Sequence, residues 1–209
     1  MTNQLAFWDL NPKSDLERKA RNLSCLECPP PFAVSKVKEW HSRLPNVQSG
    51  PWQFAFLASL GEEVVAVALW HNPSARMLPP HWLELRRLAC SPDAPRNTCS
   101  WFLARMAKFF RQNFPHRERL ISYQDTAVHL GTIYKASGWD PVATSKPRLR
   151  DRSKSRTSLD SRMYRTNMNG NDVDGSAKTR WEKVIGTRDD SAIEKHEPLL
   201  QTDLFGGRP

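Results

Sequence analysis

The sequence has few cysteines and no long apolar segment. Four cysteines in 209 residues are too few for a disulfide scaffold, so a reducing compartment such as the cytoplasm fits. No apolar run approaches the ~20 residues that a membrane-spanning helix needs. The first residues also lack the basic start and apolar block of a secretion signal. These absences argue against a membrane protein and against a disulfide-rich secreted protein.

Acidic residues are outnumbered by basic ones. The chain carries 31 Lys and Arg against 22 Asp and Glu, a formal net charge of +9. This excess favours a polyanionic partner, nucleic acid first and a membrane surface or a phosphate-rich cofactor second; the alternative is a merely basic protein. Arg148, Arg150 and Arg152 alternate with other residues in the basic segment 147–165. In an extended chain they would project to one side and contact DNA phosphates.

Cys25 and Cys28 have the spacing of half a zinc site. Neither a second such pair nor a pair of histidines at ligand spacing follows in the sequence. Two ordinary thiols are therefore the expected state, with a metal site as the alternative.

The hydrophobic pattern predicts an α/β (α+β) fold with a central mixed, mostly antiparallel twisted sheet flanked by helices. Apolar runs at 52–60 and 64–70, joined by a turn at 61–63, predict a hairpin with both faces covered. Further strands are expected at 82–90, 117–125 and 139–142, and helices at 15–23, 35–44, 97–114 and 126–137. The three prolines at 29–31 are expected to form a stiff extended connector.

Composition divides the chain into three parts. Residues 1–31 form a polar N-terminal extension, and residues 32–166 hold the apolar residues of a single domain. Residues 167–209 begin with an Asn/Gly/Asp-rich stretch and are expected to be a largely disordered tail. Only a short ordered piece is expected there, around 180–185.

The turn between strand 82–90 and helix 97–114 is a candidate anion-binding site. Unpaired backbone N–H groups and the positive end of the helix dipole meet at a helix N-terminus. Arg96 adds a full charge, and Asn97, Thr98 and Ser100 add hydrogen-bonding groups. The natural ligand is a diphosphate. The alternative is that Asn97 or Thr98 only caps the helix.

The order of elements around this turn resembles the GCN5-related N-acetyltransferase fold. The segment Ile133-Tyr134-Lys135-Ala136-Ser137-Gly138-Trp139 is similar to that fold's Leu-Tyr-x-x-x-Gly-Phe signature. The resemblance implies that Tyr134 is a general acid toward the thiolate of coenzyme A. It also implies that acyl-CoA, such as acetyl-CoA, is bound by Arg96, Asn97, Thr98, Cys99 and Ser100. Cys99 and Trp101 stand where the loop of that fold has glycine, which is a departure from ordinary acyl-CoA binding.

A closer resemblance, over roughly residues 50–145, is to the phage-encoded Mom family of DNA adenine-modifying proteins. The matching blocks are Leu85-Arg86-Arg87-Leu88, Ala94-Pro95-Arg96-Asn97-Thr98 with Ser100, and Ser122-Tyr123-Gln124-Asp125-Thr126-Ala127-x-His129-x-Gly131-Thr132-Ile133-Tyr134-Lys135-Ala136. The resemblance implies conversion of the adenine N6 amine of double-stranded DNA to a carbamoylmethyl derivative. This modification would protect phage DNA from restriction in the cytoplasm of the bacterial host. Acyl-CoA and iron are the cofactors that it suggests, and the residues themselves establish neither.

Four candidate catalytic residues follow from these resemblances. The family's functional residues match Arg87, Ser100 and Asp125, and the tyrosine of the wider fold matches Tyr134. We expect Arg87 and Ser100 to flank the anion-binding turn, and Asp125 to lie at a strand end where the sheet splays. Asp125 could there orient the amine, accept its proton or ligate a metal. Its alternative role is to cap the next helix.

DNA contacts are also expected outside this site. Modification of the N6 amine favours extrusion of the base. Three tryptophans are candidates for stacking on it: Trp70, Trp82 and Trp139. The basic face of helix 97–114 is either a solvated surface or a contact to phosphates, and it carries Arg105, Lys108 and Arg111.

The end of the chain contains a separate short motif. Gln201-Thr202-Asp203-Leu204-Phe205 resembles the peptide by which bacterial proteins bind the DNA sliding clamp. A flexible tail with an apolar pair suits a groove-binding peptide. The clamp is therefore a second expected partner.

The main prediction is a DNA-modifying transferase, and two rival functions stay open. The first is a plain acyl-CoA-dependent N-acetyltransferase that acts on a protein or a small amine. The residues Cys99 and Trp101, in place of glycines, disfavour it. The second is a non-catalytic DNA-binding module that kept the fold, and the joint presence of Asp125 and Tyr134 disfavours that. The oligomeric state is left open.

Overall fold

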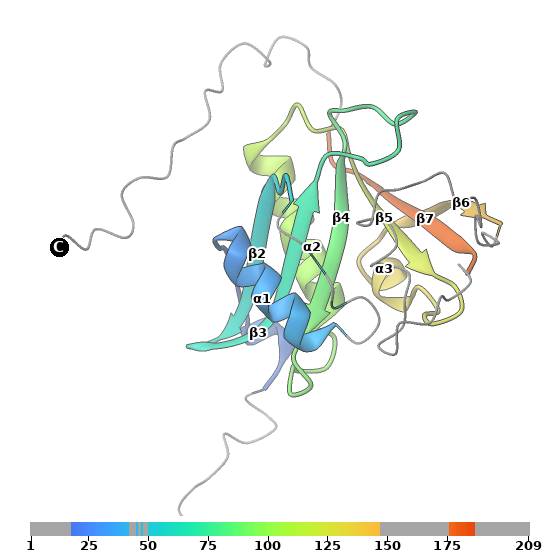
Figure 1. Ribbon diagram of the computed structural model, residues 1–209. Coiled ribbons are helices and arrows are strands. Elements are labelled where there is room, and N and C mark those ends of the chain that lie inside the picture. The colour runs from blue at the N-terminus through green and yellow to red at the C-terminus, as the bar shows by residue number, and fades with distance from the viewer. Residues whose placement is uncertain (1–17, 42–44, 46, 48–49, 147–175, 187–209) are drawn as a thin grey trace, which may run out of the picture.

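The structure is a computed structural model that describes residues 18–41, 45, 47, 50–146 and 176–186. Its seven strands form one sheet in the order β1-β2-β3-β4-β5-β7-β6 (Figure 1). The strands are β1 Ser24–Glu27, β2 Phe54–Leu60, β3 Glu63–His71, β4 Leu83–Cys90, β5 Arg119–Asp125, β6 Asp140–Ser145 and β7 Lys178–Val184. The helices are η1 Ala20–Asn22, α1 Pro30–Trp40, α2 Thr98–Asn113 and α3 Thr132–Ala136. The expected α/β class with a mixed, mostly antiparallel sheet is confirmed, since only β4 and β5 pair in parallel.

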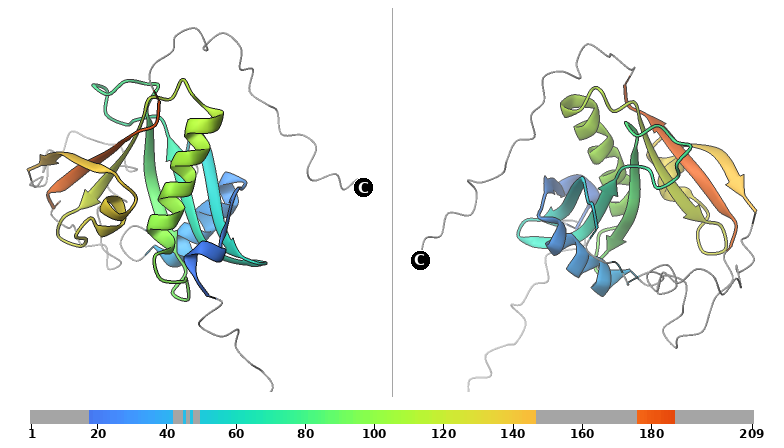
Figure 2. Two further views of the ribbon diagram at one scale, coloured as in Figure 1. Left: turned by 180° about the vertical axis from the view of Figure 1, so that it is seen from behind. Right: turned by 45° about the horizontal axis from the view of Figure 1, so that its top comes forward.

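The two faces of the sheet carry different layers. Helix α1 covers β2, β3 and β4 on one face, and α2 lies across the opposite face (Figures 1 and 2). The core on the α2 side is built around Phe56, Trp70, Phe102 and Phe110, each no more than 1% exposed, and it continues to Tyr134 of α3. A smaller cluster under α1 includes Ala33, Val37, Val67, Leu69 and Ala89. The continuous apolar runs of β2 and β3 are explained because a helix covers each face.

The sheet splays where β4 meets β5. The two strands pair only from Leu83–Leu85 to Leu120–Ser122. Beyond these three positions Arg86–Cys90 and Tyr123–Asp125 are not paired with each other, and the strands diverge (Figure 1). Helix α2 begins at the open end, shortly after β4. The splay therefore lies beside the predicted anion-binding turn.

Helix α1 begins earlier than predicted. It starts at Pro30, so two of the three prolines occupy its first turn and do not form an extended connector. Proline is tolerated there because the first N–H groups of a helix have no intrahelical partner. Ser35 lies inside the helix, where its hydroxyl donates to the carbonyl of Phe32 at 2.7 Å.

Helix α3 begins later than predicted. It starts at Thr132, and residues 126–131 form a turn in which the amides of Val128 and His129 donate to the carbonyl of Asp125. Gly131 precedes the helix with φ +73°, a conformation that favours glycine. A Cβ atom on it would lie 2.5 Å from a ring carbon of Trp181. This glycine therefore ends the turn, and its lack of a side chain leaves room for the ring of Trp181.

Two strands come from outside residues 32–166. β1 pairs with β2 at one edge, and β7 lies between β5 and β6. The short ordered piece expected at 180–185 thus overlaps the seven-residue strand β7, which is anchored by Trp181, 2% exposed. A helix was expected at 15–23. Within the described part of that range, only the short 3-10 helix η1 is found. None of the described helices has the length and apolar character needed to cross a membrane.

Candidate functional site

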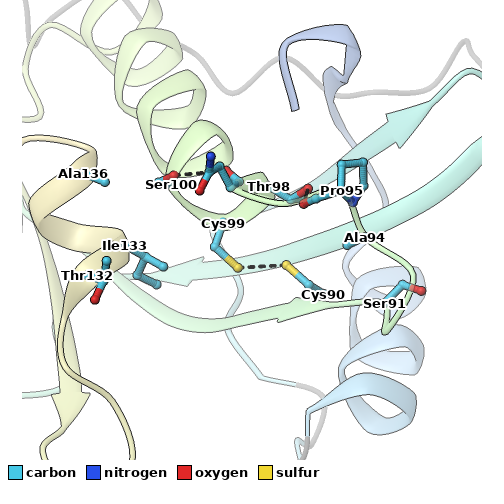
Figure 3. Close-up of a pocket in the computed structure, with 11 residues that line it drawn as sticks. Cys90, Ser91, Ala94, Pro95, Thr98, Cys99, Ser100, Thr132, Ile133 and Ala136 are labelled. Carbon is cyan, nitrogen blue, oxygen red and sulfur yellow. Dashed lines mark hydrogen bonds between the residues drawn. The ribbon is translucent and has the colours of Figure 1, made fainter. Parts of the chain in front are cut away.

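A pocket of about 310 Å³ lies between the end of β4, the first turn of α2 and α3 (Figure 3). Four of the five predicted donor-binding residues line it, namely Asn97, Thr98, Cys99 and Ser100. Arg96, the fifth, is exposed and does not line it. Thr132 and Ile133 of α3 close the other side. The predicted turn therefore forms one wall of this pocket.

The first turn of α2 has no side-chain cap. Asn97 adopts a left-handed conformation with φ 68°, and its side chain makes no cap hydrogen bond. The hydroxyl of Thr98 donates backwards to the carbonyl of Pro95 at 2.6 Å. The capping role considered for these two residues is therefore not realised. The amide of Thr98 donates to the carbonyl of Pro95 at 3.1 Å, so this 16-residue helix offers an anionic ligand its positive end and the remaining amides of its first turn.

Two thiols meet in this pocket. The Sγ atoms of Cys90, at the end of β4, and Cys99, in α2, lie 3.0 Å apart (Figure 3). The hydrogen bond from Cys90 lowers the pKa of Cys99, and the backbone N–H of Cys99 acts in the same direction against burial. The same contact and burial raise the pKa of Cys90. Sequence reasoning missed Cys90, because a nine-residue spacing carries no motif.

Arg87 lies on the other face of the sheet from the pocket. Leu88 and Cys90 pack on the α2 side of the sheet. Arg87 lies on the opposite face together with Ala89, which packs in the cluster under α1. Arg87 is 6% exposed, and its guanidinium donates a hydrogen bond to the carbonyl of Arg86 at 2.8 Å. The expectation that Arg87 and Ser100 flank the turn together is therefore wrong, because strand alternation turns Arg87 away from it.

Asp125 lies at the splayed end of β5, as expected, and on the same face as Arg87. Its carboxylate accepts hydrogen bonds from Ser176 at 2.5 Å and from the Ala127 amide at 3.1 Å, and it pairs with Lys178 at 3.3 Å. Partial burial alone would raise its pKa, but the Ser176 hydrogen bond and the Lys178 charge lower it. Asp125 is thus ionised at neutral pH, and it caps the 126–131 turn rather than a helix.

His41 is a neighbour of Arg87 that sequence reasoning missed. It follows the last residue of α1. Burial and the charge of Arg87, with a smaller contribution from His129, lower its pKa to about 4. It is therefore neutral at physiological pH. No local pattern in the sequence distinguishes this histidine from one at any helix end.

Tyr134 is buried behind the pocket wall and does not line the pocket. Its hydroxyl shares a 2.9 Å hydrogen bond with Ser122, and its ring stacks on Trp181 with centroids 5.3 Å apart. Burial raises its pKa, and this effect outweighs the lowering by the Ser122 hydrogen bond. Tyr134 thus stays protonated, as a general acid must. Its hydroxyl does not contact the pocket directly, because other residues lie between them.

The predicted DNA contacts are only partly within the described residues. Arg105, Lys108 and Arg111 are exposed on α2, as expected, whereas Arg148, Arg150, Arg152 and the motif at 201–205 lie outside those residues. The tryptophan predictions are wrong. Trp70 and Trp139 lie in the core and are 0% and 2% exposed. Trp82 precedes β4 at the end far from the splay, and its indole N–H donates a hydrogen bond to Glu118.

The described residues offer no iron site. No group of three or more His, Cys, Asp or Glu side chains comes together in this part of the chain. Burial raises the pKa of both Cys25 and Cys28 to about 12, so they are protonated thiols rather than ready metal ligands.

Solved structures share this fold. The ribosomal-protein-S18-alanine N-acetyltransferase of Escherichia coli matches with a TM-score of 0.52 and 9% identity, over 80% of this chain and 97% of its own. A GNAT-family acetyltransferase of Streptococcus pneumoniae matches with a TM-score of 0.52 and 12% identity, over 78% and 99%. The ribosomal-protein-S5-alanine acetyltransferase of Vibrio fischeri gives 0.52 and 9%, over 80% and 96%. At these identities the likeness establishes a GCN5-related N-acetyltransferase fold and nothing about substrates.

Sequence comparison identifies the family. No curated protein matches the chain. The model of the Mom protein family matches residues 68–195, more than half of the sequence. This stretch contains the splayed strands, the pocket and all four candidate catalytic residues. The chain therefore belongs to the Mom protein family and has the fold of the GCN5-related N-acetyltransferases.

Proposed function

We propose that this protein modifies the exocyclic N6 amine of adenine in double-stranded DNA, and so protects phage DNA from host restriction. The observation that carries the proposal is the Mom family match across residues 68–195, which include the site. The net charge of +9 supports a polyanionic substrate. The modification implied by the resemblance is a carbamoylmethyl group.

The donor in this proposal is an acyl thioester such as acetyl-CoA. The uncapped first turn of α2 would hold its phosphates, with Asn97 and Ser100 beside them. The bound thioester supplies an activated acyl group. The fit is partial, because the side chains of Cys99 and Trp101 stand where the fold usually has glycine. A set of residues that would hold iron is absent from the described ranges, and the proposal uses no metal.

The acceptor amine in this proposal approaches from the α1 face. Arg87 and Asp125 lie there on the unpaired ends of β4 and β5, with the donor pocket on the other face. The ionised Asp125 carboxylate would accept a hydrogen bond from the amine and take its proton during attack. Arg87 would hold a phosphate of the target strand. The base must leave the duplex stack to reach them.

The test is the nucleoside composition of DNA from bacteria that express the full chain. We expect a heavier deoxyadenosine, and its loss in Asp125→Ala. Asp140→Ala is the matched control, since Asp140 is an exposed carboxylate on β6. Fragmentation then reports the bond, because carbamoylmethyl joins nitrogen to a methylene carbon and direct acyl transfer joins it to a carbonyl carbon. Unmodified deoxyadenosine in cells that hold folded protein would refute the proposal.

A second candidate is an N-acetyltransferase acting on a protein or small amine. The acetyltransferase fold and the pocket at the helix N-terminus favour it. Incubation of the purified chain with acetyl-CoA and a panel of peptides and amines tests it. Acetylated peptide or amine together with unmodified DNA would select this function over the first.

A further inference from the structure

The face of the sheet that carries Asp125 also presents a tyrosine. Tyr123 lies two residues before Asp125 on β5, so strand alternation places both side chains on one face, about 7 Å apart along the strand. Helix α1 covers β2, β3 and β4 of this face (Figure 1). Tyr123 is 37% exposed, and it is the only exposed residue of β5. An aromatic ring is therefore accessible beside the carboxylate that is proposed to take the proton of the amine.

Two arginines lie on the strands on either side of Tyr123. Arg180 is the residue of β7 that pairs with Tyr123, and Arg86 is the first residue of β4 beyond the three positions paired with β5. Each arginine forms an ion pair with a buried carboxylate, Arg180 with Glu182 at 2.8 Å and Arg86 with Glu84 at 3.3 Å. Neither arginine side chain is itself buried. The ion pairs therefore hold both guanidinium groups near the ring and leave part of each accessible to a phosphate.

Tyr123 presents a neutral ring. Burial and the charge of Glu84 raise its pKa, against the charge and the side-chain hydrogen bond of Arg180. Glu84 thus lies close to Tyr123 as well as to Arg86. Because the phenol is protonated at neutral pH, its ring can stack on a base without repelling the phosphates of the same strand.

A base that leaves the duplex loses its stacking partners, and an enzyme that extrudes it must offer another surface. Aromatic rings supply such a surface, while basic residues hold the backbone beside it. The three tryptophans expected in this role lie in the core or at the far end of β4. Tyr123 instead combines an exposed ring with two neighbouring arginines and with Asp125.

We propose that the adenine extruded from the duplex stacks on Tyr123, with its N6 amine toward Asp125. The phosphates next to that nucleotide are held by Arg86 and Arg180. This inference rests on the proposed function and adds to it the place at which the base is held. It includes no covalent step, because the ring only positions the base. It also assigns a DNA contact to the face formed by β4, β5 and β7, which is separate from the basic face of α2.

The first measurement is the modified deoxyadenosine in DNA from bacteria that express the full chain. Tyr123→Leu keeps an apolar side chain but has no aromatic face, so it should lower modification roughly 5- to 150-fold, the range for loss of one base–aromatic stack. Tyr123→Phe keeps the ring and should recover the modification that Tyr123→Leu loses. Val184→Ala is the matched control and should modify DNA normally, because Val184 is 56% exposed on the same face, four residues beyond Arg180.

The second measurement locates the base without any reaction at its amine. The purified full chain is mixed with a duplex in which 5-iodouracil replaces an adenine opposite thymine, since a mismatched base leaves the stack at low cost. Ultraviolet light joins iodouracil to an aromatic side chain in contact with it. Fragmentation of the cross-linked peptide should place the bond at Tyr123 and not at Tyr134, which the same tryptic peptide contains. This measurement uses the unaltered chain, so it decides the question even if thermal unfolding shows that a variant is not folded.

The outcomes separate this inference from the proposed function. Undiminished modification by Tyr123→Leu, or modified DNA with a cross-link only at another residue, overturns the inference and leaves the function. Equal losses in Tyr123→Phe and Tyr123→Leu also overturn it, since the hydroxyl and not the ring would then matter. A cross-link at Tyr123 with unmodified DNA supports the place of the base and refutes the proposed reaction. Absence of both the cross-link and the modification overturns both.

Discussion

Replacing Gly131 by Ala should destabilise the protein through two separable effects. Gly131 has φ +73°, and an alanine there would be strained by about 1–2 kcal/mol. Its Cβ would also lie 2.5 Å from a ring carbon of Trp181 and 2.8 Å from the side-chain oxygen of Gln124. Trp181 is buried, stacks on Tyr134 and donates to Gln124, so the ring cannot move freely. Overpacking of this kind costs about 1–3 kcal/mol.

Gly61→Ala is the matched control for this prediction. Gly61 has φ +61°, but nothing lies within 4 Å of the Cβ position, so only the strain applies. Both substitutions reduce the entropy of the unfolded chain equally, and this contribution cancels in the comparison. Urea denaturation should therefore place Gly131→Ala about 1–3 kcal/mol below Gly61→Ala in free energy of unfolding. Equal losses would show that Trp181 does not press on the backbone at this turn.

Three other properties of the molecule can be measured directly. Glu182→Gln should lower the free energy of unfolding by about 2–3 kcal/mol, because the buried carboxylate pairs with Arg119 and Arg180, whereas Glu63→Gln at an exposed pair should cost less than about 1 kcal/mol. The pKa of His41 is about 4 in the folded state and near 6.5 when unfolded, so stability should fall as pH drops from 6.5 toward 4, and His41→Gln should flatten that slope in thermal melts. Limited alkylation at neutral pH should label Cys99 before the other cysteines, since its pKa alone is lowered among the four, and an even labelling pattern would contradict this.

DNA binding should also depend strongly on salt. Basic residues that contact phosphates release counterions, so raising salt from low to physiological levels should weaken binding by orders of magnitude. Fluorescence anisotropy with a labelled duplex measures this. If binding does not change with salt, the net positive charge does not support a DNA partner.

Periodicity predicted the elements with a strong apolar signal. Helix α2 was expected at 97–114 and spans Thr98–Asn113, because its buried side chains recur at helical spacing. The hairpin β2–β3 was expected from two apolar runs around Gly61, and it forms there. The anion-binding turn was predictable for the same reason, since a strand and a helix on either side fix where a helix N-terminus must lie.

The failures have physical causes that are absent from local sequence. β7 reads as a charged segment with one tryptophan, and its place beside β5 is set by contacts made across more than 50 residues. The Gly131 turn depends on Trp181, which is equally distant in sequence. The face of the sheet on which Arg87 lies depends on strand alternation near a bulge in the β3–β4 pairing at Leu69/Trp70. The contact between Cys90 and Cys99 exists only once α2 folds back onto β4.

The place of β7 also sets when the site can form. Among the described strands, β6 pairs only with β7, and β7 is the last of the described elements to be synthesised. During translation β5 and β6 must therefore wait for Lys178–Val184 to leave the ribosome before this half of the sheet can close. A nascent chain that lacks those seven residues also lacks the ring on which Tyr134 stacks, so competence for chemistry should arrive in one late step of biogenesis.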